Sequence, residues 1–153
     1  MSVPVGIIGV GTYFPTKIER AADLVEGSGI PADILWKKMG IRQRHVAGLE
    51  DTVSFMASEA AKDAIAQSGI SPEQINMVIS HGSELKDHIV WNSAGLTPEQ
   101  SVYLEDYGHI RSVDQAVQIE IGLQQGKIKP GDLIVIVGAG TGSTWSAIAV
   151  RWG

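Results

Sequence analysis

The stretch "LIVIVGAGTGSTWSAIAVRWG" at residues 133–153 places a glycine-rich loop between two apolar segments. The residues from Leu133 to Val137 form an apolar run of strand length. A dinucleotide-binding turn requires a helix after the glycines and an acidic residue about 20 positions later. Here eleven residues follow Gly142, none of them is acidic, and they alternate as a strand does. The stretch therefore predicts a β-hairpin and argues against a phosphate-binding turn.

The glycines of this loop allow two interpretations. Glycine supplies the positive φ angles that tight hairpin turns need. A two-residue turn needs fewer glycines than Gly138, Gly140 and Gly142 together provide, so the loop also predicts a close approach of the backbone to another group. Backbone N–H groups presented in such a loop can stabilise an oxyanion.

Apolar periodicity along the rest of the chain predicts alternating strands and helices. Strands that alternate with helices form a largely parallel sheet covered by helices. We therefore expect an α/β fold in a single domain, residues 1–153. The expected elements are a strand in 3–15, helices at 29–40 and 52–68, a strand at 75–80, a helix at 84–95, a strand at 101–108, a helix at 112–126, and strands at 133–137 and 144–152.

The helix expected at 52–68 carries the clearest pattern. Either Thr52 or Asp51 can cap its start, and Gly69 ends it. Its many alanines predict close packing on the sheet. Its expected buried face gathers six apolar residues, namely Val53, Met56, Ala57, Ala60, Ala64 and Ile65.

Composition argues against several classes of function. The net charge of -5 and the pI near 5.3 argue against a nucleic-acid partner, because such binding needs clustered Lys and Arg. The 153 residues contain no cysteine, which excludes disulfides, thiolate metal sites and thiol nucleophiles within this chain. No apolar segment approaches the roughly 18–20 residues that span a bilayer, and no signal peptide is recognisable. We therefore expect a cytoplasmic protein without a membrane partner.

The segment "SHGSELKDH" at 80–88 gathers residue types that bind metals, His81, Glu84, Asp87 and His88. Helix-borne zinc motifs place two histidines at i and i+4, whereas these two are seven positions apart. We therefore interpret the segment as polar surface and expect no metal site.

Two parts of the chain resemble a known family. The segments "GIIGVGTYFP" (6–15), "KMGIRQRHVAGLEDTVSFMASEAAKDAI" (38–65) and "QINMVIS" (74–80) resemble the start of ketoacyl-acyl-carrier-protein synthase III enzymes of the thiolase superfamily. The segment "VYLEDYGHIRSVDQAVQIEIGLQQGKIKPGDLIVIVGAGTGSTWSAIAVRW" (102–152) resembles their C-terminal end. By this resemblance, residues 1–95 correspond to the N-terminal part and residues 96–153 to the C-terminal part. The central region with the family's catalytic cysteine and histidine has no counterpart, so the chain resembles a truncated acyltransferase of fatty acid biosynthesis.

The resemblance implies a specific fold and assembly. The family is built from two similar halves, and this chain resembles one half. We expect a five-stranded mixed sheet in the order 3-2-1-4-5, with strand 5 antiparallel and helices on both faces. Two copies would then form a homodimer that rebuilds the family's five-layer body, with the helix at 112–126 of each copy between the two sheets.

The resemblance also implies candidate site residues. His109 stands where the family has the asparagine of its catalytic set, and a helix N-terminus disfavours the protonated form of a histidine, which suits a general base. Thr141 and Gly142 lie in "GTGSTWS" (140–146), which matches the family's oxyanion loop "GGGFTWG". Coenzyme A would contact three residues, Trp36, Lys38 and Arg42. The alternatives are a histidine that only caps the helix and a basic patch that is only solvated.

Two hypotheses for function follow. The first is a non-catalytic or minimal thiolase-fold module that forms a homodimer and binds acyl-coenzyme A weakly. The second is an active acyl-thioester enzyme, transferring or hydrolysing acyl groups, that uses His109 and the glycine-rich loop. The first is favoured because the family's covalent acyl-enzyme needs a thiolate and the chain has none. The expected partners are a second copy and an acyl-coenzyme A or acyl carrier protein, and coenzyme A thioester is expected as a ligand, not as a resident cofactor.

Overall fold

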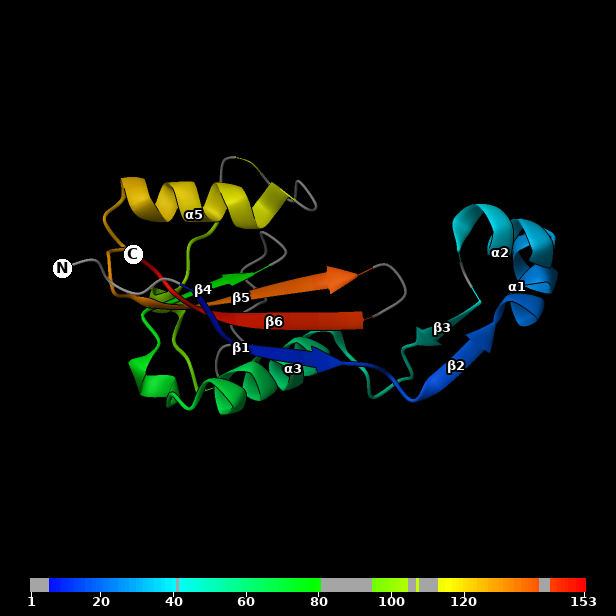
Figure 1. The fold of residues 1–153 in the computed structure, drawn as a ribbon, viewed down its shortest axis with the longest axis horizontal. Coiled ribbons are helices and arrows are strands. Elements are labelled where there is room, and N and C mark those ends of the chain that lie inside the picture. Colours follow the sequence, from blue (N-terminus) through cyan, green and yellow to red (C-terminus); the bar gives the residue numbers. More distant parts are fainter. Residues whose placement is uncertain (1–5, 41, 81–94, 105–106, 108–112, 141–143) are drawn as a thin grey trace.

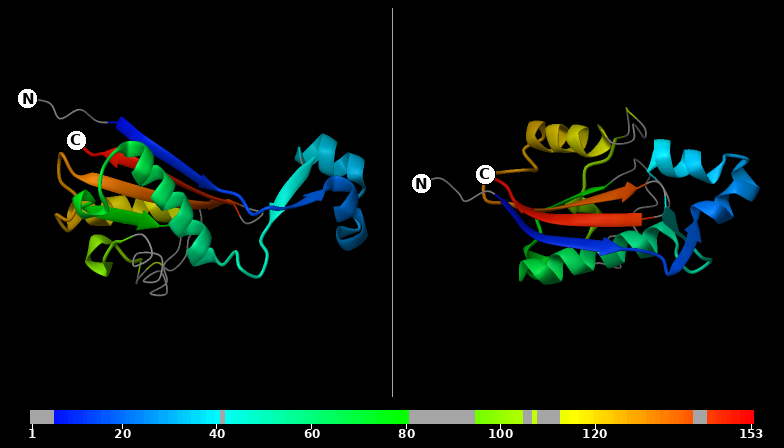
Figure 2. Two further views of the ribbon diagram at one scale, coloured as in Figure 1. Left: turned by 90° about the horizontal axis from the view of Figure 1, so that it is seen from below. Right: turned by 45° about the vertical axis from the view of Figure 1, so that its right-hand side comes forward.

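The computed structural model describes residues 6–40, 42–80, 95–104, 107, 113–140 and 144–153. These residues form a body, in which two helices lie on opposite faces of a sheet, and a lobe of residues 17–46 that projects from one end of the body (Figures 1 and 2). In chain order, the helices and strands are β1 (Gly6–Tyr13), β2 (Lys17–Arg20), α1 (Ala21–Ser28), α2 (Ala32–Met39), β3 (Gln43–Val46), α3 (Val53–Ser68), β4 (Met77–Ser80), α5 (Asp114–Gln124), β5 (Leu133–Gly140) and β6 (Thr144–Arg151), with 3-10 turns at Pro72–Gln74 and Pro98–Gln100.

The sheet of the body has the order β1-β6-β5-β4. β4 and β5 are parallel, whereas β6 is antiparallel to both β5 and β1, so the expected α/β class, the mixed sheet and the antiparallel last strand are confirmed. α3 covers one face of the sheet and α5 lies on the other (Figure 1). The hairpin predicted from the glycine-rich stretch is present, because β5 and β6 pair from Leu133↔Arg151 to Gly140↔Thr144.

The expected strand order 3-2-1-4-5 is wrong. The first strand does not lie in the middle of the sheet but at its edge, beside β6, and the strands at 77–80 and 133–140 pair directly. The burial of these strands explains the difference. β5, which lies inside the sheet, is buried over Leu133–Val135 and at Val137, whereas Ile7 and Val10 of β1, at the edge, are exposed on one face of the sheet. The central position came from the resemblance and not from the residues of β1.

The strand expected at 101–108 is reduced to a single bridge within the described residues. Ser101 bridges to Val78 of β4 in parallel orientation, and its hydroxyl donates to the Val78 carbonyl at 3.3 Å. Val102 and Leu104 are nevertheless buried. The segment therefore continues the sheet beyond β4 without forming a full strand.

α3 is the best-predicted element. The Thr52 hydroxyl caps it by accepting from the Phe55 N–H at 3.2 Å, and Gly69 ends it with a left-handed φ of 70°. Five of the six residues expected on its buried face are buried, whereas Val53 is exposed in the first turn. The helix lies so close to β1 that a Cβ on Gly9 or Gly11 would collide with the α3 backbone.

The opposite face of the sheet has its own core. Met77 and Ile79 of β4, Val102, Ile128 and Ile134 are buried together there, and Ile119 and Ile121 of α5 pack against them. α5 ends near Gly126, which has a left-handed φ of 67°. The helix predicted at 112–126 is thus confirmed for Asp114–Gln124.

The lobe contains elements that the sequence did not predict, apart from the helix expected at 29–40. β2 and β3 form a two-stranded antiparallel sheet, and Arg44 of β3 pairs with Glu19 of β2 at 3.0 Å. Strands of four residues have too little alternation to stand out in the sequence. Among the described helices of the whole chain, none has the length and apolarity needed to cross a membrane.

Gly11 tests the contact between α3 and β1. In Gly11→Ala the new Cβ meets the Ala60 carbonyl and the Ala64 amide, so the helix must move away from the sheet. We expect a loss of about 1–3 kcal/mol in the free energy of unfolding, measured by urea denaturation. Gly6→Ala is the matched control in the same strand, because its Cβ meets nothing within 4 Å. Equal stability of the two variants would contradict the close contact.

Candidate functional site

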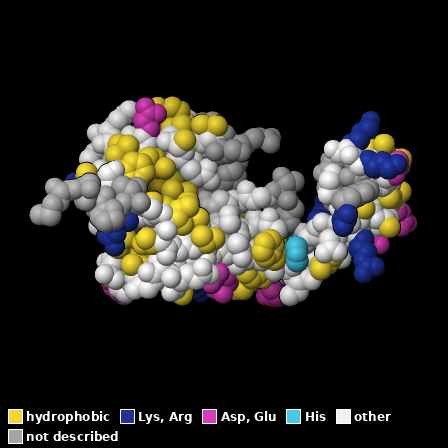
Figure 3. Space-filling model, viewed as in Figure 1, with side chains coloured by type: hydrophobic (Ala, Val, Ile, Leu, Met, Phe, Trp, Pro, Cys, Tyr) yellow, Lys and Arg dark blue, Asp and Glu magenta, His cyan; other side chains and the backbone are white. Residues whose placement is uncertain are grey.

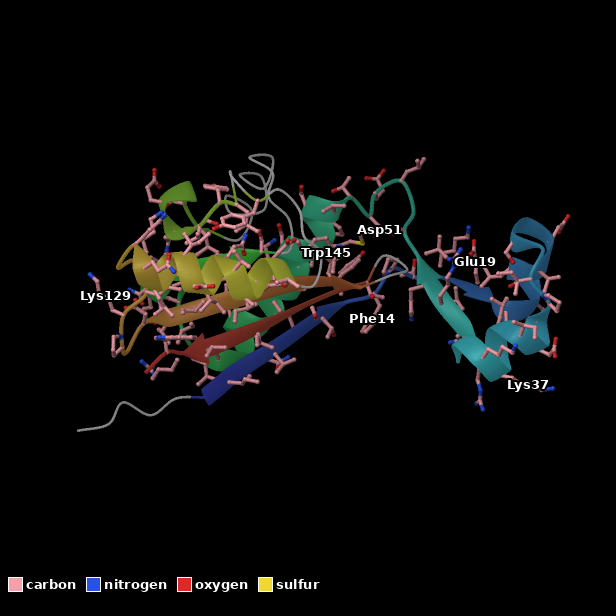
Figure 4. The ribbon with its side chains drawn as sticks, turned by 90° about the horizontal axis from the view of Figure 1, so that it is seen from above. Phe14, Glu19, Lys37, Asp51, Lys129 and Trp145 are labelled. Atoms are coloured by element: carbon pink, nitrogen blue, oxygen red, sulfur yellow. The ribbon has the colours of Figure 1, made fainter. Side chains whose placement is uncertain are left out.

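A pocket of about 240 Å³ lies where β1 and β5 end and β6 begins. In open sheets that contain parallel strands, ligands bind at the carboxyl ends of those strands, and the pocket lies at that end of β5. In Figure 4, Phe14 and Trp145 mark this end of the body, next to the lobe. The described lining of the pocket comes from β1, β5 and β6 and from Phe14, which follows β1. The lining residues are Thr12, Phe14, Gly138, Ala139, Gly140, Thr144, Trp145 and Ser146.

Among the described residues, the lining of the pocket carries no charged side chain. It includes two aromatic residues, three hydroxyl-bearing residues and the stretch of β5 from Gly138 to Gly140. Gln115 of α5 lies beside it, since its amide nitrogen donates to the Val137 carbonyl at 3.3 Å and lies 3.6 Å from the position of a Cβ on Gly138. A site of this kind suits an uncharged, partly apolar group with a few hydrogen-bonding atoms.

The pocket adjoins the neck, residues 13–16 and 47–52, which joins the lobe to the body. The Tyr13 hydroxyl donates to Asp51 Oδ1 at 2.5 Å, and Asp51 Oδ2 accepts from the Gly48 N–H at 2.8 Å. The hydrogen bond to Asp51 raises the pKa of Tyr13, and the charges of Asp51 and Glu59 add to this. The same bond, helped by the Gly48 N–H, lowers the pKa of Asp51.

A second set of contacts crosses the neck at Phe14. Its ring lies 5.1 Å from the imidazole of His45 in β3, measured between ring centroids. His45 Nδ1 also forms a hydrogen bond with the Pro15 carbonyl at 2.5 Å. Phe14 therefore contacts the lobe on one side and lines the pocket on the other.

The structure separates the residues expected to contact coenzyme A from this pocket. Lys38 and Arg42 are exposed, and α2, which contains Lys38, lies at the outer end of the lobe. Figure 4 shows the neighbouring Lys37 at that far end, whereas Phe14 and Trp145 lie near the body. Trp36 also belongs to α2, but its side chain lies outside the described part of the structure. The coenzyme A contact of these residues stays a prediction.

The residues expected to act in catalysis fall outside the described residues. These residues are His109, Thr141 and Gly142. His81 and His88, which were considered as metal ligands, also lie outside the described residues. Gly140 and Thr144, which flank residues 141–143 in the sequence, both line the pocket. Within the described ranges, no group of three or more His, Asp or Glu side chains is arranged to hold a metal ion.

Sequence reasoning found only part of the pocket. It identified the glycine-rich stretch of β5 and β6, but not Thr12 or Phe14, and not the bond between Tyr13 and Asp51. The segment "GVGTYFP" at 9–15 was the available signal, because it places glycines, a hydroxyl and two aromatic rings directly after a strand.

Comparisons of sequence identify relatives. The family model for the C-terminal part of 3-oxoacyl-[acyl-carrier-protein] synthase III matches residues 65–152. The β-ketoacyl-[acyl-carrier-protein] synthase III of Symbiobacterium thermophilum is 31% identical over 133 residues, which are 83% of this chain and 40% of that protein. The enzyme of the same name from Escherichia coli O9:H4 is 38% identical over 73 residues, 48% of this chain and 23% of that protein. The chain thus spans less than half the length of these relatives.

Solved structures agree on the fold. The priming β-ketosynthase of the R1128 polyketide pathway matches 99% of this chain and 51% of its own, with a TM-score of 0.73 and 16% identity. Xanthomonas campestris OleA, solved with bound lauric acid and lauroyl-CoA, matches 97% of this chain and 56% of its own, with a TM-score of 0.70 and 17% identity. Because the family model covers more than half of its residues, the chain belongs to the 3-oxoacyl-[acyl-carrier-protein] synthase III family.

Proposed function

We propose that this chain is a minimal, non-catalytic thiolase-fold module that forms a homodimer and binds acyl-coenzyme A weakly. The observation that carries the proposal is the incomplete face of the sheet on the α5 side, which needs a covering layer. A covalent acyl-thioester intermediate needs a thiolate nucleophile, and the 153 residues contain no cysteine. Condensation by such an intermediate is therefore not open to this chain alone.

The burial of α5 supports a second layer. A helix on a solvent-exposed surface directs its apolar residues to the core and its polar residues outward. In α5, the polar residues Asp114 and Gln118 are buried. Leu123 is 43% exposed, and Val113, just before the helix, is 52% exposed. Apolar side chains thus occur on more than one side of α5, as in a helix enclosed between two layers.

The sheet beside α5 offers a matching surface, the bare strip of Ile7, Val10, Ile148 and Val150. Ile7 pairs with Val150 and Val10 with Ile148 across β1 and β6, and directly paired residues share a face of the sheet. The next strand, β5, places Ile134 of the α5-side core on this same face. Figure 3 shows hydrophobic side chains gathered on this face of the body.

These two surfaces complement each other in a two-fold dimer. Each copy carries one helix with exposed apolar residues and one bare strip next to it, so two copies can cover both surfaces by exchanging the same contact. α5 of each copy then lies between the two sheets, as in the five-layer assembly expected from the family resemblance. Val10 is 47% exposed and Ile7 62% exposed in one copy alone, and burial of such area is the main favourable term in association.

The pocket supports weak binding of an acyl thioester. Its described lining, which is uncharged and includes Phe14 and three hydroxyl-bearing residues, suits an acyl chain and the amides of a thioester arm better than a phosphate. OleA, which has a similar fold, is known with lauroyl-CoA bound, and this makes lauroyl-CoA a suitable probe. An acyl carrier protein as donor, participation in fatty acid biosynthesis and a cytoplasmic location are further parts of the proposal, supported by the names and the resemblance of the relatives.

Gly138→Ala tests the pocket. The new Cβ lies 3.6 Å from the Gln115 amide nitrogen and 3.9 Å from the Ser146 hydroxyl, which are ordinary contacts, so the fold tolerates it while the pocket loses space. We expect a several-fold increase in the Kd for lauroyl-CoA, measured by calorimetry, at an unchanged melting temperature. Gly6→Ala, at the opposite end of β1, is expected to bind as the unaltered chain does. Equal affinity of Gly138→Ala and Gly6→Ala would exclude this pocket.

The same samples separate binding from catalysis. Release of free coenzyme A from lauroyl-CoA is followed with a thiol reagent, which the cysteine-free chain does not consume. We expect binding without turnover. Turnover that disappears in His109→Ala would instead support an acyl-thioester enzyme and reject the non-catalytic module.

Leu123→Asp tests the homodimer. We expect the unaltered chain to show twice its mass of 16.3 kDa by light scattering after gel filtration. A carboxylate on the outer side of α5 would be desolvated in the dimer, so the variant is expected to be monomeric. Leu49→Asp is the matched control, because Leu49 is 99% exposed in the neck and away from α5. A monomeric unaltered chain, or a dimer that persists in Leu123→Asp, would reject this interface.

A further inference from the structure

We propose that Tyr13 and Asp51 are positioning residues whose hydrogen bond fixes the lobe on the body and thereby holds Phe14 in place as a wall of the pocket. The hold on the lobe stands on the contacts of the neck alone. Its effect on ligand affinity rests on the proposed function of the pocket.

Asp51 ties together the two chain segments that cross the neck. One oxygen of its carboxylate accepts from the hydroxyl of Tyr13, the last residue of β1 before the lobe. The other accepts from the N–H of Gly48, in the segment that leaves the lobe. A single side chain therefore bridges the entry and the exit of the lobe.

Tyr13 is itself anchored in the body. Its ring meets the ring of Phe55 in α3 edge to face, with centroids 5.4 Å apart and planes at 80°. In the sheet, Tyr13 pairs with Trp145, which lines the pocket. Successive side chains of an extended segment point to opposite faces, so the anchoring of Tyr13 on the α3 side directs the adjacent Phe14 toward the pocket. Phe14 lines the pocket accordingly.

Among the described residues, the lobe has few other contacts that could keep its orientation. Its elements pack mainly on one another, α1 on α2 and β2 on β3. Among the described side chains of residues 16–50, only Leu35 is buried. Figure 1 and the left view of Figure 2 show the lobe projecting away from the body. Its orientation therefore depends on the neck, where the Tyr13–Asp51 bond and the Phe14–His45 contact lie.

Hydrogen exchange followed by mass spectrometry tests the hold on the lobe. Tyr13→Phe keeps the ring against Phe55 and removes only the hydroxyl donor. We expect peptides from the lobe to exchange several-fold faster, and peptides from α3 and β5 to exchange at unchanged rates. Tyr107→Phe is the matched control, because Tyr107 is exposed and outside the neck. Unchanged exchange of the lobe in Tyr13→Phe would overturn the proposal.

Ligand binding to the same variants separates the two parts of the inference. We expect Tyr13→Phe to bind lauroyl-CoA several-fold more weakly than the unaltered chain. Asp51→Asn is expected to bind with an affinity between the two, because its amide oxygen still accepts one of the two hydrogen bonds of Asp51. If the unaltered chain binds no lauroyl-CoA while Tyr13→Phe loosens the lobe, the proposed function fails and the hold on the lobe stands. If Tyr13→Phe loosens the lobe but binds lauroyl-CoA normally, the positioning of Phe14 is rejected.

The ionisation of Tyr13 gives a readout that a purely structural role would not change. Phenol ionisation, followed at 295 nm, is expected above the ordinary pKa of 10.0 for Tyr13, because its bond to Asp51 and the nearby charge of Glu59 favour the protonated form. The bond then stabilises the attachment of the lobe fully below pH 10.0, and this stabilisation is lost as the pH rises through the raised pKa of Tyr13. On the acid side it contributes above the ordinary Asp51 value of 3.8 and is lost as the pH falls through the lowered pKa of Asp51. Asp51→Asn is expected to move the Tyr13 midpoint back toward 10.0, and an unmoved midpoint would overturn the bond.

Discussion

The close contact of α3 with Gly9 and Gly11 is the constraint on which the rest of the structure depends. With no side chains at these two positions, the α3 backbone at Ala60 and Ala64 approaches β1 directly. Interiors are packed as densely as organic crystals, so this contact fixes β1 against both α3 and β6. It thereby sets where β1 ends, and so the positions of Tyr13, of Phe14 and of the neck that follows.

The two faces of the sheet differ because only one of them has a complete cover. On the α3 side, Trp145, Ala147 and Ala149 of β6 are buried together with the alanines of the helix. On the other side, α5 packs on β4 and the bare strip of β1 and β6 remains exposed. The same β1 that is tightly packed on one face is therefore the least covered strand on the other. Within the described part of the chain, this half of the sheet therefore has no covering layer on the α5 side.

The sequence predicted the elements that local patterns determine, and failed where distant segments decide. α3 and the β5–β6 hairpin were predicted because caps, alanine spacing and alternation are read within one segment. The strand order was wrong because pairing depends on which strands meet in space, and the exposed Ile7 and Val10 of β1 reveal an edge strand only once the sheet is known. The pocket was predicted only in part. The sequence identified the glycines of β5, but Phe14 lines the pocket only because the chain turns at the neck.

The glycines of "GAGTGSTW" can now be interpreted physically. Gly138 and Gly140 lie within β5, and a side chain at Gly138 would enter the pocket beside Gln115 and Ser146. Their small size therefore leaves space for a ligand at the carboxyl end of the strand. A phosphate cradle would instead need a helix N-terminus after the glycines, and here β6 follows. The loop makes room beside a neutral lining, and what the pocket can accept then depends on how firmly the neck holds Phe14 across from these glycines.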